Sequence, residues 1–116
     1  MDGSVIPDST ARSALDGVVA LADLVAYQPG AVVSRTIVKK PAGTVTAFAF
    51  DAGEGLSEHT AAFDALVLVT EGESEVTVDG VTHRVAGGQV LCLPASRPHA
   101  LKALTKFKMV LIMIRE

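Results

Sequence analysis

The chain has 116 residues, a hydrophobic content of 49%, a charged content of 20% and a formal net charge of −3 at pH 7. This length is typical of one domain, and the apolar composition excludes a disordered chain. The acidic balance, the absence of tryptophan and the lack of a basic cluster beyond Lys39 and Lys40 argue against a nucleic-acid-binding surface.

Membrane and secretion signals are also missing from the sequence. A membrane helix needs about eighteen uncharged apolar residues, and the longest late apolar run, Met109 to Ile114, ends at Arg115. The N-terminus carries Asp2 and Asp8 instead of a basic stretch and an apolar core, so no secretory signal is expected. Cys92 is the only cysteine, which excludes an intramolecular disulfide and fits a reducing compartment. We therefore expect a cytoplasmic protein with no membrane contact.

The first thirty residues contain the only helical candidate. Apolar residues recur there at three- and four-residue spacing at Leu15, Val18, Val19 and Ala22. Asp16 stands in the first turn of this candidate helix, where a carboxylate is favoured. A turn at residues 27–30 follows, since Pro29 and Gly30 supply restricted and permissive backbone positions. We predict an N-terminal arm over 1–30 with one short helix, followed by residues 31–116 of the same single domain.

From residue 31 onward, short β-type runs are separated by Gly, Pro and Asp at the regular spacing of a sandwich or barrel. We predict strands near 32–39, 44–51, 57–61, 66–71, 73–79, 81–86, 89–93, 99–103 and 107–115. Asp79-Gly80 predicts a type I′ hairpin, because both central residues of that turn take positive φ. The last predicted strand is apolar on both faces, so we expect it in the middle of the fold. No internal repeat or linker divides the chain.

Two stretches of this β region carry a further pattern. The residues that form it are Gly53, His59 and Gly72 in the first stretch and Gly88, Pro94 and His99 in the second. They resemble the two motifs of the cupin superfamily, G-x5-H-x-H-x3,4-E-x6-G and G-x5-P-x-G-x2-H-x3-N. Ser96 and Ala103 stand where the second motif has glycine and asparagine. The resemblance covers about residues 31 to 115 and implies an all-β fold, a double-stranded β-helix or RmlC-like jelly-roll barrel of the small single-domain kind.

The resemblance also implies a metal site, and this sequence departs from it. In metal-containing cupins, three histidines and one glutamate bind a divalent transition metal such as Fe, Mn, Ni, Cu or Zn. The first ligand position corresponds to His59 and the last to His99, whereas the second histidine position is Ala61 and the glutamate position is Ala65. Alanine has no donor atom, and zinc and non-haem iron sites use at least three protein ligands. The resemblance therefore leaves an incomplete, degenerate metal site.

The candidate ligand pocket has three polar residues. His59 and His99 either hold a metal, contact a ligand and move protons, or are neutral pocket residues bonded to each other or to water. Asp64, one residue before the glutamate position, is a polar anchor at the pocket mouth or a turn residue. His83 fits a structural role, and we expect Cys92, in an apolar run, to be a small buried hydrophobe.

We predict a small-molecule-binding cupin domain of unassigned substrate. One alternative implied by the family is a metal-dependent enzyme of dioxygenase, isomerase or decarboxylase type acting on a small organic compound. Others are a non-catalytic metabolite-sensing module and a barrel whose pocket is filled by its own side chains. Small cupins commonly dimerise, so we also expect a homodimer in which residues around 31–39 pair across a two-fold axis.

Overall fold

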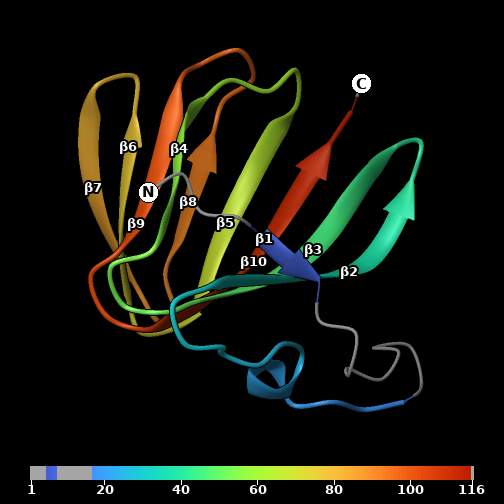
Figure 1. The fold of residues 1–116 in the computed structure, drawn as a ribbon. Coiled ribbons are helices and arrows are strands. Elements are labelled where there is room, and N and C mark those ends of the chain that lie inside the picture. Colours follow the sequence, from blue (N-terminus) through green and yellow to red (C-terminus); the bar gives the residue numbers. More distant parts are fainter. Residues whose placement is uncertain (1–4, 8–16, 116) are drawn as a thin grey trace.

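The structure is a computed structural model that describes residues 5–7 and 17–115. Nearly all regular structure in these residues is β (Figure 1). The strands are β1 (Val5–Pro7), β2 (Val32–Lys40), β3 (Gly43–Phe50), β4 (Gly55–His59), β5 (Asp64–Glu71), β6 (Glu73–Val78), β7 (Val81–Ala86), β8 (Val90–Leu93), β9 (His99–Ala103) and β10 (Phe107–Ile114). A single 3-10 turn, η1 (Leu21–Asp23), precedes β2.

The strands form two facing sheets. A six-stranded sheet has the order β1-β2-β3-β10-β5-β8, and a four-stranded sheet has the order β4-β9-β6-β7. Figure 1 shows the four-stranded sheet on one side and β10, β3 and β2 on the other, with the chain crossing repeatedly between them. All neighbouring strands are antiparallel except β1 and β2, which run parallel. The predicted jelly-roll barrel is confirmed.

The predicted strand pattern holds along the whole β region, and the Asp79-Gly80 hairpin has the expected backbone. Asp79 has φ 53° and Gly80 has φ 80°, so both residues have the positive φ that a type I′ turn needs. The expectation for the last strand is also confirmed, because β10 pairs with β3 on one side and with β5 on the other.

The predicted N-terminal helix is wrong wherever the structure describes that region. Leu15 and Asp16 fall outside the described residues, whereas Val18 and Val19 have irregular, exposed backbone. Only η1 is helical, and it has no side-chain cap. A stretch this short gains too few hydrogen bonds to nucleate an α-helix. The side chains of Val18, Val19 and Leu21 are exposed, so no apolar face stabilises a helix there either.

The N-terminal arm lies on the outer face of the six-stranded sheet instead of forming a helix. Val25 is 3% exposed and packs with Val33 and Ala49 in a small second cluster outside the barrel. Two polar contacts fix the arm there: Lys108 Nζ donates to the Ala22 carbonyl oxygen at 2.5 Å, and the Tyr27 hydroxyl donates to Glu71 Oε2 at 2.7 Å. Burial, together with the hydrogen bond to Glu71, raises the pKa of Tyr27 well above its usual value.

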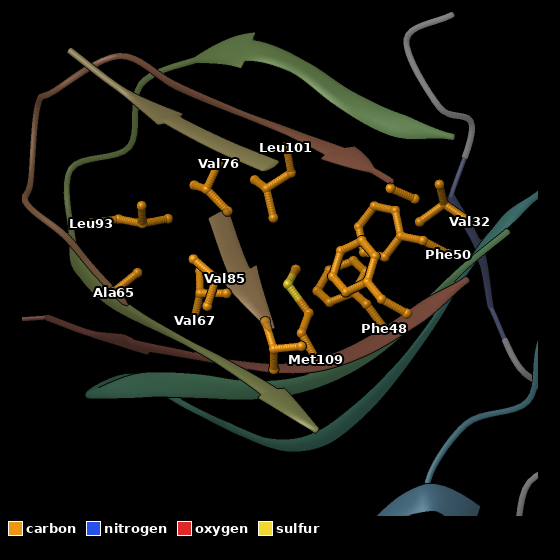
Figure 2. Packing of buried hydrophobic residues seen from close by; sticks show 13 residues of the cluster. Val32, Phe48, Phe50, Ala65, Val67, Val76, Val85, Leu93, Leu101 and Met109 are labelled. Atoms are coloured by element: carbon orange, nitrogen blue, oxygen red, sulfur yellow. The ribbon is translucent and has the colours of Figure 1, made fainter. Parts of the chain in front are cut away.

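The main core fills the space between the sheets (Figure 2). Because successive side chains of a strand point to opposite faces, alternate residues of each strand enter it. Its largest fully buried side chains include Phe50 and Phe107, whose rings stack with centroids 4.4 Å apart and an interplanar angle of 10°. Each fully buried apolar side chain of this kind stabilises the fold by about 1.5–3 kcal/mol, so this core dominates the stability of the barrel.

The two ends of the barrel differ in the residues that close them. At the aromatic end, β3 finishes at Phe50 and β10 begins at Phe107, which are Cα partners. At the histidine end, β4 finishes at His59 and β9 begins at His99. Within residues 5–7 and 17–115, no helix is long and apolar enough to cross a membrane.

Candidate functional site

His59 and His99 are brought together by strand pairing. They are Cα partners in the antiparallel β4–β9 pair, although 40 residues separate them in the chain. A register shift between Leu56 and His59 adjusts the end of β4. His99 is 7% exposed, whereas His59 is exposed, so one ring of the pair is reachable from solvent.

The two imidazoles are in direct contact through their Nε2 atoms, which lie 3.1 Å apart. The ring centroids are 4.4 Å apart and the ring planes meet at 69°. The Nδ1 atoms point to backbone carbonyl oxygens: His59 Nδ1 is 2.7 Å from the Ser57 oxygen, and His99 Nδ1 is 3.1 Å from the Arg97 oxygen. Both rings are therefore oriented through Nδ1, and their Nε2 atoms face each other.

These contacts decide which nitrogen carries the hydrogen. A carbonyl oxygen only accepts hydrogen bonds, so each Nδ1 is the protonated nitrogen of its ring. Each neutral ring then presents the lone pair of Nε2, and the two lone pairs converge. A hydrogen bond between the two Nε2 atoms would require a further proton on one ring. A bound molecule with an O–H or N–H group can instead donate a hydrogen bond to one of the two lone pairs.

The environment of His99 keeps that further proton off at neutral pH. Burial, which disfavours the charged ring, lowers the pKa of His99 below its usual value. The carbonyl of Arg97 acts in the opposite direction, and the neighbouring His59 lowers the pKa further. At neutral pH His99 therefore presents its Nε2 lone pair as a hydrogen-bond acceptor, directed towards the Nε2 atom of His59.

The wall at the same end of the six-stranded sheet is apolar. Ala65 is 6% exposed, belongs to the main core, and is the Cα partner of Met113 on one side and Leu93 on the other. Figure 2 shows Ala65 and Leu93 on the inner side of the barrel. The inward-facing wall at this end of the six-stranded sheet is therefore apolar.

The side chains present do not fit a resident divalent metal. Among the described residues, no group of three or more His, Cys, Asp or Glu side chains is placed to hold a metal ion. Ala61 lies beyond the end of β4, and its carbonyl oxygen accepts a 2.8 Å hydrogen bond from the Ser96 backbone. Ala65 offers a methyl group where the family has a carboxylate. Two imidazoles alone are one ligand short of the smallest protein set in zinc and non-haem iron sites.

Asp64 is held at the histidine end, but on the other face of its strand. Exposed Asp64 alternates with Ala65 and Val67, which are buried in the core, so its side chain points away from the barrel interior. Its Oδ1 accepts a 2.9 Å hydrogen bond from the Ala95 backbone. It lines a surface cavity of about 280 Å³ with Phe63 and Arg115, whose guanidinium carbon lies 4.5 Å from the Phe63 ring centroid.

Two other residues were assigned from sequence. Cys92 was expected to be buried, and this was wrong: it is exposed on β8, where it alternates with the core residue Leu93. The apolar sequence around Cys92 does not show whether a strand has one face in solvent, as β8 at the sheet edge has, or both faces covered. His83 is half-buried on β7 with Val76 as its Cα partner, on the same face as buried Val85.

Two features of this end were not predicted from the sequence. Ser96 has φ 63°, the left-handed conformation that favours glycine, which explains why the family motif has glycine there. The hydroxyl of Thr44 is buried and has no hydrogen-bond partner among the described residues, an arrangement that costs about 1–3 kcal/mol. The signal for it in the sequence is that Thr44 and Thr46 occupy the same face of the strand as Phe48 and Phe50.

Comparison with known proteins gives the family. Residues 47–115, more than half of the chain, match the model of the cupin domain family. The chain belongs to the cupin family. This segment runs from within β3 to the end of β10. It contains His59, His99 and all four strands of the smaller sheet. A search of curated proteins finds no match to this cupin.

Solved structures agree with the family assignment. A conserved protein of unknown function from Streptococcus pyogenes is 35% identical, with a TM-score of 0.83, 87% of this chain and 89% of that chain covered. A cupin superfamily protein from Desulfitobacterium hafniense is 28% identical, with a TM-score of 0.83 and coverage of 87% and 93%. A cupin 2 conserved barrel domain protein from Leptotrichia buccalis is 42% identical, with a TM-score of 0.79 and coverage of 81% and 46%.

Proposed function

We propose that this cupin binds a small organic molecule at the histidine end of the barrel, without a resident metal. The observation that carries the proposal is the pair of Nε2 atoms 3.1 Å apart, with both Nδ1 atoms bound to backbone carbonyl oxygens. Two converging lone pairs are poorly satisfied by each other. A hydroxyl or other protic group of a ligand can donate a hydrogen bond to the pair, so that the two lone pairs no longer face each other unsatisfied.

The metal-dependent enzyme is the less favoured alternative. It needs donors at the positions of Ala61 and Ala65, and neither residue has one. The same two alanines favour ligand binding, because small side chains leave room beside the imidazoles that a histidine and a glutamate would otherwise take. Turnover is not part of the proposal, and binding without chemistry agrees with the role of a metabolite sensor.

The test is binding of a metabolite panel, followed by substitution of the exposed ring. Thermal shift measurements at pH 7 on the intact chain identify stabilising compounds, since a ligand that binds only the folded state raises Tm. His59→Asn is expected to lower the affinity for any such ligand about tenfold, because one hydrogen bond is lost. His83→Asn, on β7 two strands from His99, is the matched control and should bind normally. A ligand that binds His59→Asn and wild type equally would contradict the proposal.

We also propose that the protein is a cytoplasmic homodimer. β1 covers β2 only from Val32 to Ser34, so the outer edge of β2 from Arg35 to Lys40 has no strand partner in the described part of the chain. An unpaired edge is a template for a second copy. Light scattering on the eluting protein should give about twice 12.0 kDa, and a monomer at micromolar concentration would contradict the dimer. The free thiol of Cys92 supports a reducing compartment.

A further inference from the structure

The hydroxyl of Thr44 is a second polar group of the barrel whose hydrogen bonding is incomplete, apart from the histidine pair. Its Oγ1 is buried and lacks a hydrogen-bond partner among residues 5–7 and 17–115. Folded proteins rarely leave a buried polar atom unsatisfied, and those that do so often keep it for a ligand or a bound water. The position of Thr44 in the fold therefore indicates which kind of ligand its hydroxyl can contact.

Thr44 faces the interior of the barrel. Phe48 and Phe50 point into the main core from β3, and side chains two residues apart share a face, so Thr46 and Thr44 point the same way. Strand pairing adds a cation to this face, because Lys39 on β2 is the Cα partner of Thr44. The inner face of the β2–β3 hairpin thus changes from aromatic side chains at one end to the hydroxyl groups of Thr46 and Thr44 at the other, where the exposed Lys39 is the Cα partner of Thr44.

These donors lie at the histidine end. Thr44 is the Cα partner of Met113 on β10, and Met113 is the partner of Ala65 on β5, so one row of inward positions crosses the sheet. Strands in a sheet are about 4.8 Å apart and facing sheets about 10 Å apart. A molecule of several carbons is therefore long enough to connect the hydroxyl-bearing hairpin with the histidine pair.

We propose that Thr44, Thr46 and Lys39 bind the carboxylate of a small hydroxy acid whose hydroxyl group donates to the His59–His99 pair. The proposal deepens, and rests on, the proposed function of the histidine site. The chemistry of the two regions is complementary: hydroxyl and ammonium groups donate to a carboxylate, which only accepts, whereas the histidine lone pairs accept from a hydroxyl.

Access to Thr44 requires one side chain to move. Met113 lies between Thr44 and Ala65 and is only partly buried against the core. Methionine is unbranched and adapts its shape at low cost. Ligand entry by a rotation of Met113 joins the two regions without any change in the strands.

The experiment uses unbranched ω-hydroxycarboxylates of four to eight carbons as probes, measured by calorimetry and thermal shift on the intact chain at pH 7. The matching carboxylates without a hydroxyl and the matching hydroxyamides are the comparison compounds. Wild type is expected to bind at least one hydroxycarboxylate at least tenfold more tightly than either analogue, because each analogue loses a hydrogen bond with a charged or buried partner.

Thr44→Val keeps the shape of the side chain and removes its hydroxyl. It should weaken binding of the hydroxycarboxylate about tenfold while the Tm of the ligand-free protein stays equal or rises, because the unsatisfied buried atom is gone. If the hydroxyl had a purely structural role, Thr44→Val would lower the ligand-free Tm and leave ligand binding unchanged. Lys39→Met should weaken binding of the carboxylate but not of the hydroxyamide. Thr77→Val is the control, since Thr77 Oγ1 is bonded to Thr82 Oγ1 on an exposed part of the smaller sheet.

The outcomes separate this inference from the function on which it rests. If His59→Asn weakens binding and Thr44→Val does not, the carboxylate site is overturned and the histidine site stands. The same holds if other compounds bind in a His59-dependent way and no hydroxycarboxylate does. If hydroxycarboxylates bind and only Thr44→Val and Lys39→Met weaken them, the role of the histidine pair is overturned. A Tm loss in ligand-free Thr44→Val overturns the ligand role of the hydroxyl.

Discussion

The aromatic end and the histidine end of the barrel are built from the same strands but under different constraints. At the aromatic end, stacked rings, a buried apolar core and close backbone contacts leave little freedom for substitution. At the histidine end, the structure holds converging lone pairs, an unsatisfied hydroxyl and alanines at two ligand positions of the family. The difference teaches that this chain keeps the residues that shape a cupin barrel and departs from the family motif at two of its metal-ligand positions.

The largest expected effect is at the aromatic end, at Gly72. Gly72 and Gly53 have nearly the same backbone, with φ 79° and 83°. A Cβ on Gly72 would collide with the Lys106 carbonyl oxygen and with Phe107, whereas a Cβ on Gly53 has nothing within 4 Å. Gly72→Ala should lose more than about 4 kcal/mol of unfolding free energy or fail to fold, and Gly53→Ala only about 1–2 kcal/mol. Denaturant unfolding followed by circular dichroism measures both, and equal losses would refute the steric explanation.

At the histidine end, restoring the donors should restore a metal site. Ala65→Glu alone places an unpaired carboxylate in the core and should cost about 3 kcal/mol or more. Ala61→His combined with Ala65→Glu provides four donors, so Ni²⁺ or Zn²⁺ should raise its Tm by several degrees. Wild type, with two donors, should show no comparable shift. A wild-type shift as large as that of the double variant would contradict the incomplete site.

The histidine pair should also make stability depend on pH. The pKa of His99 is lowered in the folded state, so between the unfolded value of 6.5 and the folded value the unfolded chain binds more protons. This contribution is therefore fully present above about pH 6.5 and is lost as the pH falls towards the folded pKa. His99→Gln should flatten the Tm profile between pH 7 and pH 5. His83→Gln is the control, and an unchanged slope in His99→Gln would exclude this origin.

The smallest expected effect concerns Ser96. A residue other than glycine in the left-handed region costs about 1–2 kcal/mol, and the greater entropy of an unfolded glycine offsets part of any gain. Ser96→Gly should therefore raise the unfolding free energy by about 1 kcal/mol or less, measured by urea unfolding. Ser57→Gly, in the middle of β4, is the comparison and should lower it. A loss in Ser96→Gly would mean that the serine hydroxyl contributes more than the backbone strain costs.

These differences explain what could be predicted from the sequence. Period-two alternation and turn residues act locally, so the strands, the Asp79-Gly80 hairpin and the central place of β10 were all predictable. The motif residues also identified His59 and His99. Their ring contacts were not predictable, because they depend on a register shift in β4 that no local pattern indicates.

The failures have a common physical cause. Cys92 and the N-terminal arm both looked apolar, but burial depends on which neighbouring element covers a face, and that is a tertiary property. Instead of forming a helix, the arm packs outside the barrel. Val25 and Tyr27 of the arm contact the barrel, and Lys108 of β10 donates to the backbone of the arm. The unsatisfied Thr44 hydroxyl required the same information, because only the paired sheet shows that it is covered.

The short parallel pairing of β1 with β2 has a practical consequence for handling this protein. Three residues, Val5 to Pro7, occupy the edge beside Val32 to Ser34. Removing the first seven residues would expose those backbone amides and carbonyls next to the part of the β2 edge that has no strand partner among the described residues. A shortened chain should therefore be more prone to form intermolecular sheets during storage and concentration, although its ligand site would be untouched.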